Sequence, residues 1–137
     1  MSPTFAQAVA IPLAAVASWL FGAAWYGLLG PAWLVALGTT KAELTGGRDR
    51  PSPLPFVLSF AAELVMASVL AILVAQLGLT GAAGGMAAGI LAFVGFVATT
   101  VGVNHAYSGA DPSLTLIDGG HWLAAMIVQG AVIGALW

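Results

Sequence analysis

The run LPFVLSFAAELVMASVLAILVAQLGL, residues Leu54–Leu79, decides the fold of this chain. It is apolar along almost its whole length and carries one ionisable side chain, Glu63. A membrane-spanning helix needs about 20 consecutive apolar residues, and this run is longer than that. A charged side chain at the middle of a bilayer costs about 2.5–3.5 kcal/mol on insertion scales, so such a residue usually has a polar partner and a function. The run therefore predicts a transmembrane helix with a polar site near its centre.

The composition of the whole chain supports the same interpretation. Of its 137 residues, 61% are hydrophobic and 6% are charged. A soluble domain has about 25% charged residues, and this chain has too few polar groups to cover a soluble surface. Its apolar segments lack the alternating polar positions of a membrane β-barrel. We predict an all-α membrane protein, a single domain over 1–137 with four transmembrane helices in one bundle, at about 8–29, 54–77, 82–103 and 116–136.

The charged residues predict the orientation of these helices. All three basic residues, Lys41, Arg48 and Arg50, lie in the connection between the first two predicted helices. Because basic loops favour the cytoplasm, we expect the loops 30–53 and 104–115 to be cytoplasmic and both termini to lie outside. No cleavable signal peptide is expected, since the N-terminus has no basic residue and the apolar stretch behind it is too long.

The first connection is predicted to contain a short interfacial helix. Proline removes a backbone donor and clashes with the preceding turn, so Gly30-Pro31 is expected to end the first helix. The apolar segment Ala32–Leu37 would then lie along the membrane interface. Thr40-Lys-Ala-Glu43 has the spacing of a capping box, and Gly46-Gly47 follows as a helix stop.

Small residues recur along the third predicted helix at intervals of three and four. They form one stripe, made of Gly85, Ala88, Gly89, Ala92, Gly95, Thr99 and Gly102. Gly130 and Gly134 form a shorter stripe in the fourth helix. Such stripes let helix backbones approach closely in a membrane, and packing within the subunit is the favoured interpretation. Because four helices enclose little volume, we also expect a homo-oligomer, held through Gly-rich helix faces.

Polar side chains lead from the cytoplasmic ends of the predicted helices toward Glu63. On the fourth helix Asp118, His121, Ala125 and Gln129 follow one another at spacings that place them on one face. The other members are at the ends of the first and third helices: Tyr26, Asn104 and His105. If these faces converge, a polar vestibule opens to the cytoplasm and closes at Glu63.

Each of these residues also has a purely structural interpretation. Glu63 could be protonated and hydrogen-bonded to another helix. Asp118 could complement the positive end of the fourth helix or pair with His121 one turn away. His105 could be an interfacial loop residue. The aromatic belt explains four tryptophans near the predicted interfaces: Trp25, Trp33, Trp122 and Trp137.

The chemistry open to such a vestibule is limited by what the sequence lacks. Two histidines and two carboxylates could hold a Zn²⁺-class or Mn²⁺/Fe²⁺-class ion. Because no H-x-x-x-H or E-x-x-H spacing occurs, the sequence does not decide whether a metal binds. A proton or cation relay from His121 to Glu63 needs fewer groups than a metal site, because histidine titrates near neutrality and can pass a proton on. No catalytic triad signature, phosphate loop or dinucleotide fingerprint is present, so no cofactor and no nucleic acid is expected.

The order of several motifs along nearly the whole chain is also informative. In chain order they are Trp25-Tyr26-Gly27, Gly30-Pro31-Ala32-Trp33, Glu63-Leu64, Asn104, Ile117–Trp122, Gly130, Gly134 and Trp137. This order resembles a family of small bacterial membrane proteins catalogued as domain of unknown function 1761. Members often have an aromatic residue before the histidine, whereas here His121 precedes Trp122. The resemblance implies a four-helix protein of the bacterial inner membrane, without a settled activity, substrate or cofactor.

Three functions are consistent with these patterns. The favoured hypothesis is a membrane protein that binds or helps to transport a small molecule or ion through the vestibule around Glu63. The second is a structural or accessory protein whose polar residues lock helix packing. The third is a membrane-embedded enzyme on a lipid-like substrate, which requires a pocket between the first two helices lined by Trp19, Gly22 and Tyr26. The sequence favours a protein that is not an enzyme.

Overall fold

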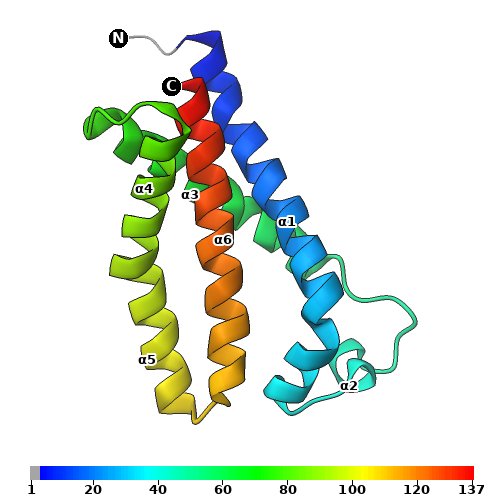
Figure 1. The fold of residues 1–137 in the computed structure, drawn as a ribbon. Coiled ribbons are helices and arrows are strands. Elements are labelled where there is room, and N and C mark those ends of the chain that lie inside the picture. Colours follow the sequence, from blue (N-terminus) through cyan, green and yellow to red (C-terminus); the bar gives the residue numbers. More distant parts are fainter. Residues whose placement is uncertain (1–3) are drawn as a thin grey trace.

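The computed structural model describes residues 4–137, and every regular element in this range is helical (Figure 1). The elements in chain order are α1 (Phe5–Leu37), α2 (Lys41–Thr45), α3 (Leu54–Gln76), α4 (Gly81–Ala92), the π-helix η1 (Phe93–Ala98), α5 (Thr99–Ser108) and α6 (Pro112–Leu136). Because α4, η1 and α5 follow one another without a break, they form one rod over Gly81–Ser108.

The predicted all-helical fold with four spans is confirmed. Within the described residues, four helices are long and apolar enough to cross a membrane: Phe5–Leu37, Leu54–Gln76, Gly81–Ser108 and Pro112–Leu136. The start of α1, the end of α6 and the turn between α3 and α4 lie at one end of the bundle, whereas α2 and the turn between α5 and α6 lie at the other (Figure 1). The bundle thus has an end with the termini and an end with the basic connection.

The hydrophobic core occupies the half of the bundle that contains the termini. Its buried members are mostly alanines with a few larger side chains: Ala14, Ala15, Ala67, Leu70, Ala71, Val74, Ala88 and Ile133. Alanine lets helix backbones approach closely in a membrane. The other half, formed by the end of α1 and the starts of α3 and α6, contributes none of these core residues. The buried polar side chains described below begin next to the core, at Ser18 and Gln129, and continue into this half.

The prediction that Gly30-Pro31 ends the first helix is wrong. The helix α1 contains Pro31 and continues to Leu37, so the apolar segment after the proline is its last part. It ends at Gly38, whose φ of 70° is left-handed and whose N–H reaches the carbonyls of Leu34 and Val35. A membrane helix tolerates an internal proline when neighbouring groups support the backbone, and Trp33 ties these last turns to α6.

The capping box predicted in the first connection is confirmed. Thr40 Oγ1 accepts from the Glu43 N–H at 3.3 Å, and the Glu43 carboxylate accepts from the Thr40 N–H at 2.8 Å. Hydrogen bonds from the Thr39 hydroxyl and the Thr40 N–H lower the pKa of Glu43. Gly46 ends the short helix α2 with a φ of 60°. The connection therefore contains a short helix, whose place at a membrane interface stays a prediction.

The stripe of small residues in the third span is interrupted at η1. A side chain at Gly85 would collide with the Gly130 carbonyl, which confirms close packing of α4 on α6 within the subunit. In contrast, no described atom lies within 4 Å of a Cβ built at Gly95 or Gly102. A π-helical turn contains an extra residue, so it rotates everything that follows relative to the residues before it. The prediction of one continuous stripe, with His105 extending it, is wrong beyond Ala92.

The third and fourth spans are also longer than predicted. The span ending in α5 reaches Ser108, so Asn104 and His105 are helical, and α6 already begins at Pro112. Asp111 caps α6, because its carboxylate accepts from the Ser113 N–H at 2.8 Å. The expected loop over 104–115 is therefore a short turn.

Candidate ligand-binding site

Helices α1 and α6 run antiparallel and pair their polar residues in order. On α1, Ser18, Gly22 and Tyr26 follow at intervals of four, so they lie on one face. This face meets Gln129, His121 and Asp118 of α6, in that order. The structure therefore places the three polar residues predicted on one face of α6 against α1.

The Glu63 carboxylate lies where α1, α3 and α6 meet. Its side chain is 2% exposed. The Ser18 hydroxyl donates to Glu63 Oε2 at 2.7 Å, and the Gln129 amide also donates to this oxygen. The same amide nitrogen lies 3.1 Å from the Glu63 carbonyl and 3.0 Å from Ser18 Oγ. No described residue donates to Glu63 Oε1, so one carboxylate oxygen has no protein donor.

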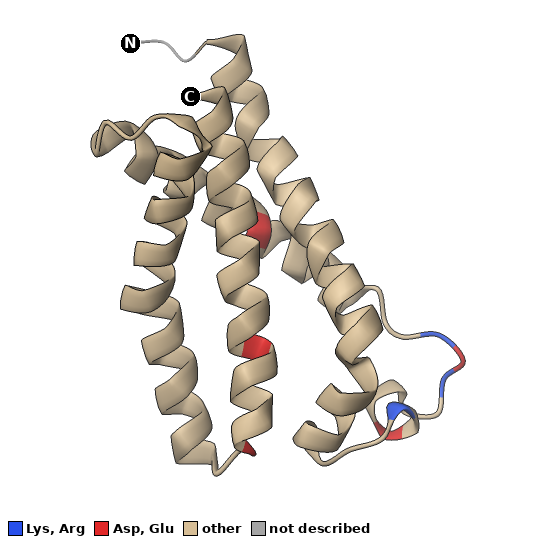
Figure 2. Ribbon diagram, in the orientation of Figure 1, with Lys and Arg blue, Asp and Glu red and all other residues tan. Residues whose placement is uncertain are grey.

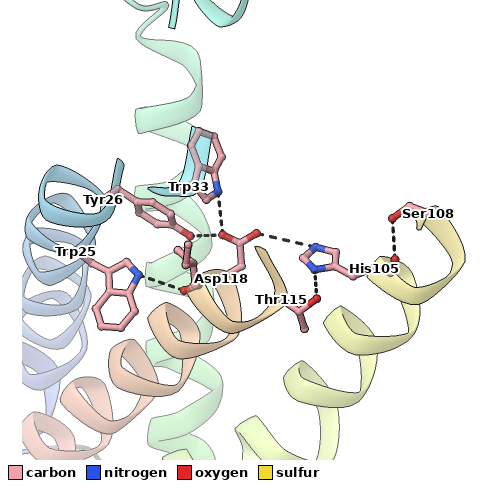
Figure 3. A network of polar contacts seen from close by, with 8 residues as sticks. Trp25, Tyr26, Trp33, His105, Ser108, Thr115 and Asp118 are labelled. Carbon is pink, nitrogen blue, oxygen red and sulfur yellow. Dashed lines mark hydrogen bonds and ion pairs between the residues drawn. The ribbon is translucent and has the colours of Figure 1, made fainter. Parts of the chain in front are cut away.

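A second polar cluster surrounds Asp118 nearer the basic connection (Figure 3). Tyr26 Oη and Trp33 Nε1 both donate to Asp118 Oδ1, at 2.8 Å and 3.1 Å. His105 Nε2 lies 4.0 Å from Asp118 Oδ2, and its Nδ1 lies 2.9 Å from the Thr115 hydroxyl. The carboxylate of Asp118 therefore connects the end of α1 and the end of α5 to α6.

A cavity of about 440 Å³ opens between α1 and α3, with α6 beneath it. Its lining residues are Trp19, Gly22, Ala23, Tyr26, Gly27, Phe56, Ser59, Glu63, His121 and Trp122. Gly22, Glu63 and His121 are buried, whereas Ala23, Gly27 and Phe56 are exposed. The cavity thus has a polar floor and an exposed rim. It has the lining, Trp19, Gly22 and Tyr26, that the hypothesis of a lipid-like substrate requires.

His121 is packed into the floor of this cavity. It is 6% exposed, and no described residue makes a hydrogen bond to its Nδ1. Its ring centroid lies 5.0 Å from that of Tyr26 and 4.8 Å from that of Trp122. A Cβ built on Gly22 would lie 2.7 Å from His121 Nε2, so the absence of a side chain there makes room for the ring. Buried polar atoms are normally paired, which makes this histidine unusual.

The predicted residues therefore form two clusters with the cavity beside them. Glu63 and Gln129 belong to one cluster, Asp118, His105 and Tyr26 to the other, and Glu63, Tyr26 and His121 line the cavity. Asn104 is exposed, and among the described residues no side-chain hydrogen bond joins it to either cluster. That part of the chain also has no group of three or more His, Cys, Asp or Glu residues that could hold a metal ion.

Ser18, Thr115 and the role of Trp33 in these clusters were not predicted from the sequence. Ser18 is the one hydroxyl side chain between Phe5 and Trp25, and this isolation in an apolar helix was a usable signal. Trp33 was assigned to the aromatic belt, but its indole N–H donates to Asp118. Likewise, Trp25 Nε1 donates to the Ile117 carbonyl at 3.1 Å.

The helices and the embedded polar clusters are typical of a multi-pass integral membrane protein. The chain matches the family described as protein of unknown function DUF1761 over residues 9–134, and it therefore belongs to this family. The resemblance seen in the sequence is thus confirmed. No curated protein and no solved structure gives a significant match to the chain.

Proposed function

We propose that this protein binds a small molecule in the cavity between α1, α3 and α6 and helps to move it across or within the membrane. The observation that carries the proposal is a buried carboxylate, Glu63, which lines a cavity of about 440 Å³ and has one oxygen without a protein donor. Ligand pockets of roughly 300–1,000 Å³ are common, and most are apolar with a few fixed polar groups. This cavity fits that description in size and lining.

The position of the cavity supports a site in the cytoplasmic half of the membrane. Its floor lies in the half of the bundle next to the connection that carries Lys41, Arg48 and Arg50, coloured blue in Figure 2. By the positive-inside rule this connection faces the cytoplasm. On this orientation the cavity lies in the half of the membrane where the vestibule around Glu63 is expected.

A structural role is the second candidate, and the hydrogen bonds of Glu63 favour it. Ser18 and Gln129 tie this carboxylate to two other helices, as interhelical polar contacts do in membranes. A structural role alone, however, explains neither the free carboxylate oxygen nor the cavity beside it. Binding accounts for all three observations.

Catalysis has less support than binding. The hydroxyls that line the cavity are already engaged: Ser59 donates to the Phe56 carbonyl at 2.9 Å, and Tyr26 donates to Asp118. A nucleophilic hydroxyl needs a base within hydrogen-bond reach, and no described hydrogen bond joins either of these hydroxyls to His121.

The proposal is tested by filling the cavity from its rim. No described atom lies within 4 Å of a Cβ at Gly27 or at Gly102, but only Gly27 lines the cavity. Gly27→Leu therefore reduces the cavity without a backbone collision, and Gly102→Leu is the matched control. The probe is 1-aminoanthracene, an apolar fluorophore, titrated into purified protein in nanodiscs.

The expected result is saturable fluorescence enhancement with the wild type and with Gly102→Leu, and at least about tenfold weaker binding by Gly27→Leu, a difference of 1.4 kcal/mol. Equal enhancement by all three proteins would mean that the probe binds elsewhere. The absence of saturable binding to the wild type would also contradict the proposal.

A further inference from the structure

We propose that the ligand of this cavity is a lipophilic organic cation, an inference that rests on the proposed binding function. Charge is the first argument. The Asp and Glu residues within the four described spans are Glu63 and Asp118, and no Lys or Arg lies there. Figure 2 shows the basic residues confined to the connection between α1 and α3. The membrane-spanning part of the protein therefore offers an entering molecule two carboxyl groups, one of them in the cavity, and no Lys or Arg.

The hydrogen bonds of Glu63 provide no counterion for its ionised form. Both groups that donate to its carboxylate, the Ser18 hydroxyl and the Gln129 amide, are neutral. A buried charge is stable when it is paired, and attraction between opposite charges is much stronger away from water. A positively charged group next to Glu63 Oε1 would supply the missing partner, whereas an anion would be repelled.

The walls of the cavity suit a cation that carries apolar groups. Four aromatic side chains line it: Trp19, Tyr26, Phe56 and Trp122. The faces of aromatic rings are electron-rich and attract ammonium groups within about 6 Å of the ring centroid. Aromatic walls around a carboxylate are thus a surface for an organic ammonium ion. A metal ion fits poorly, because no group of three or more His, Cys, Asp or Glu residues occurs in the described chain.

The rim of the cavity points to a lipophilic ligand. Ala23 and Gly27 lie within α1 and Phe56 lies near the start of α3, and all three are exposed. Their exposure places the mouth on the side of the bundle, between two spans, where acyl chains would surround it. A molecule that partitions into the bilayer can therefore enter sideways, with its charged group directed to the floor.

The test compares two ligands of equal shape. One is 4-phenylbutyltrimethylammonium, and the other is its neutral isostere, in which carbon replaces the nitrogen. Each competes with bound 1-aminoanthracene in nanodiscs, and concentrations are corrected for partition into the lipid. The proteins are the wild type, Glu63→Gln, and Asp111→Asn as a control that removes one carboxylate outside the cavity while keeping the cap of α6.

We expect the cation to displace the probe from the wild type at a concentration at least about tenfold lower than the isostere requires. The reason is that only the cation can form an ion pair with Glu63 and cation–π contacts with the aromatic rings. Glu63→Gln should remove this preference while still binding the isostere, and Asp111→Asn should keep it.

Equal displacement of the probe by both ligands in the wild type would refute the proposal of a cationic ligand but not the proposed binding function. Failure of the probe to bind at all would overturn both. The wild-type comparison is decisive even where Glu63→Gln does not fold, and circular dichroism and gel filtration identify that case.

Discussion

Substitution of Gly22 by alanine tests whether His121 is held where the structure places it. A Cβ at Gly22 would lie 2.7 Å from His121 Nε2. Ordinary contact needs about 3.5 Å, so the imidazole must move by roughly 0.8 Å. It cannot move freely, because Tyr26 and Trp122 pack against the same ring. Forced shifts in a packed interior cost about 1–3 kcal/mol, which is the expected destabilisation by this one contact.

Gly27→Ala on the same helix is the matched control. No described atom lies within 4 Å of a Cβ there, so the new methyl group has room. Both substitutions gain about 0.8–1.0 kcal/mol of helix propensity, which cancels in the comparison. The difference in stability between Gly22→Ala and Gly27→Ala therefore isolates the contact with His121.

The assay is equilibrium unfolding in mixed micelles of dodecyl sulfate and a mild detergent, followed by circular dichroism. We expect Gly22→Ala to unfold at a lower denaturant fraction than Gly27→Ala, by about 1–3 kcal/mol. Equal stability would refute the placement of the imidazole against α1, and with it the floor of the cavity.

Two further predictions concern packing and pH. Gly85→Ala should cost at least about 1–3 kcal/mol in the same unfolding assay, because its methyl group meets the Gly130 carbonyl, whereas Gly102→Ala should be neutral or stabilising; equal effects would refute the packing of α4 on α6. Hydrogen bonds from the side chain and backbone N–H of Ser113 lower the pKa of Asp111, so its stabilising effect is present above the unfolded pKa of about 3.9 and is lost as the pH falls through the folded pKa. Asp111→Asn should remove this acid-dependent part of the thermal stability between about pH 2 and 5, and an unchanged pH profile would contradict it.

The sequence was sufficient to predict the number of spans and a membrane-embedded Glu63 with polar partners. Both follow from where apolar runs begin and end and from one charge within them, which are local properties. The face of α6 was also predictable, since Asp118, His121 and Gln129 lie in a helix without interruption. In each case the regular geometry of a single helix carries the inference.

What the sequence could not predict depends on contacts between helices. The last turns of α1 follow a proline that normally ends a helix, and the indole of Trp33 reaches Asp118 across the bundle. Ser18 gained its role from the rotation of α1 relative to α3, which one sequence does not determine. The separation into two clusters had the same cause, since which polar groups meet depends on how the helices are rotated and spaced.

The π-helix η1 separates two contact surfaces on one rod. Before it, Gly85 and Gly89 face α6 at backbone distance; after it, His105 faces Thr115 and Asp118. One residue corresponds to about 100° of rotation in an α-helix, so the extra residue turns everything after η1 by about this angle relative to an uninterrupted α-helix. If Phe93–Ala98 were an α-helix of the same length, His105 would turn away from Asp118, whereas deletion of one residue there would remove the π-turn and keep His105 facing Asp118. The single π-turn thus determines that the third span places His105 next to Asp118 of α6.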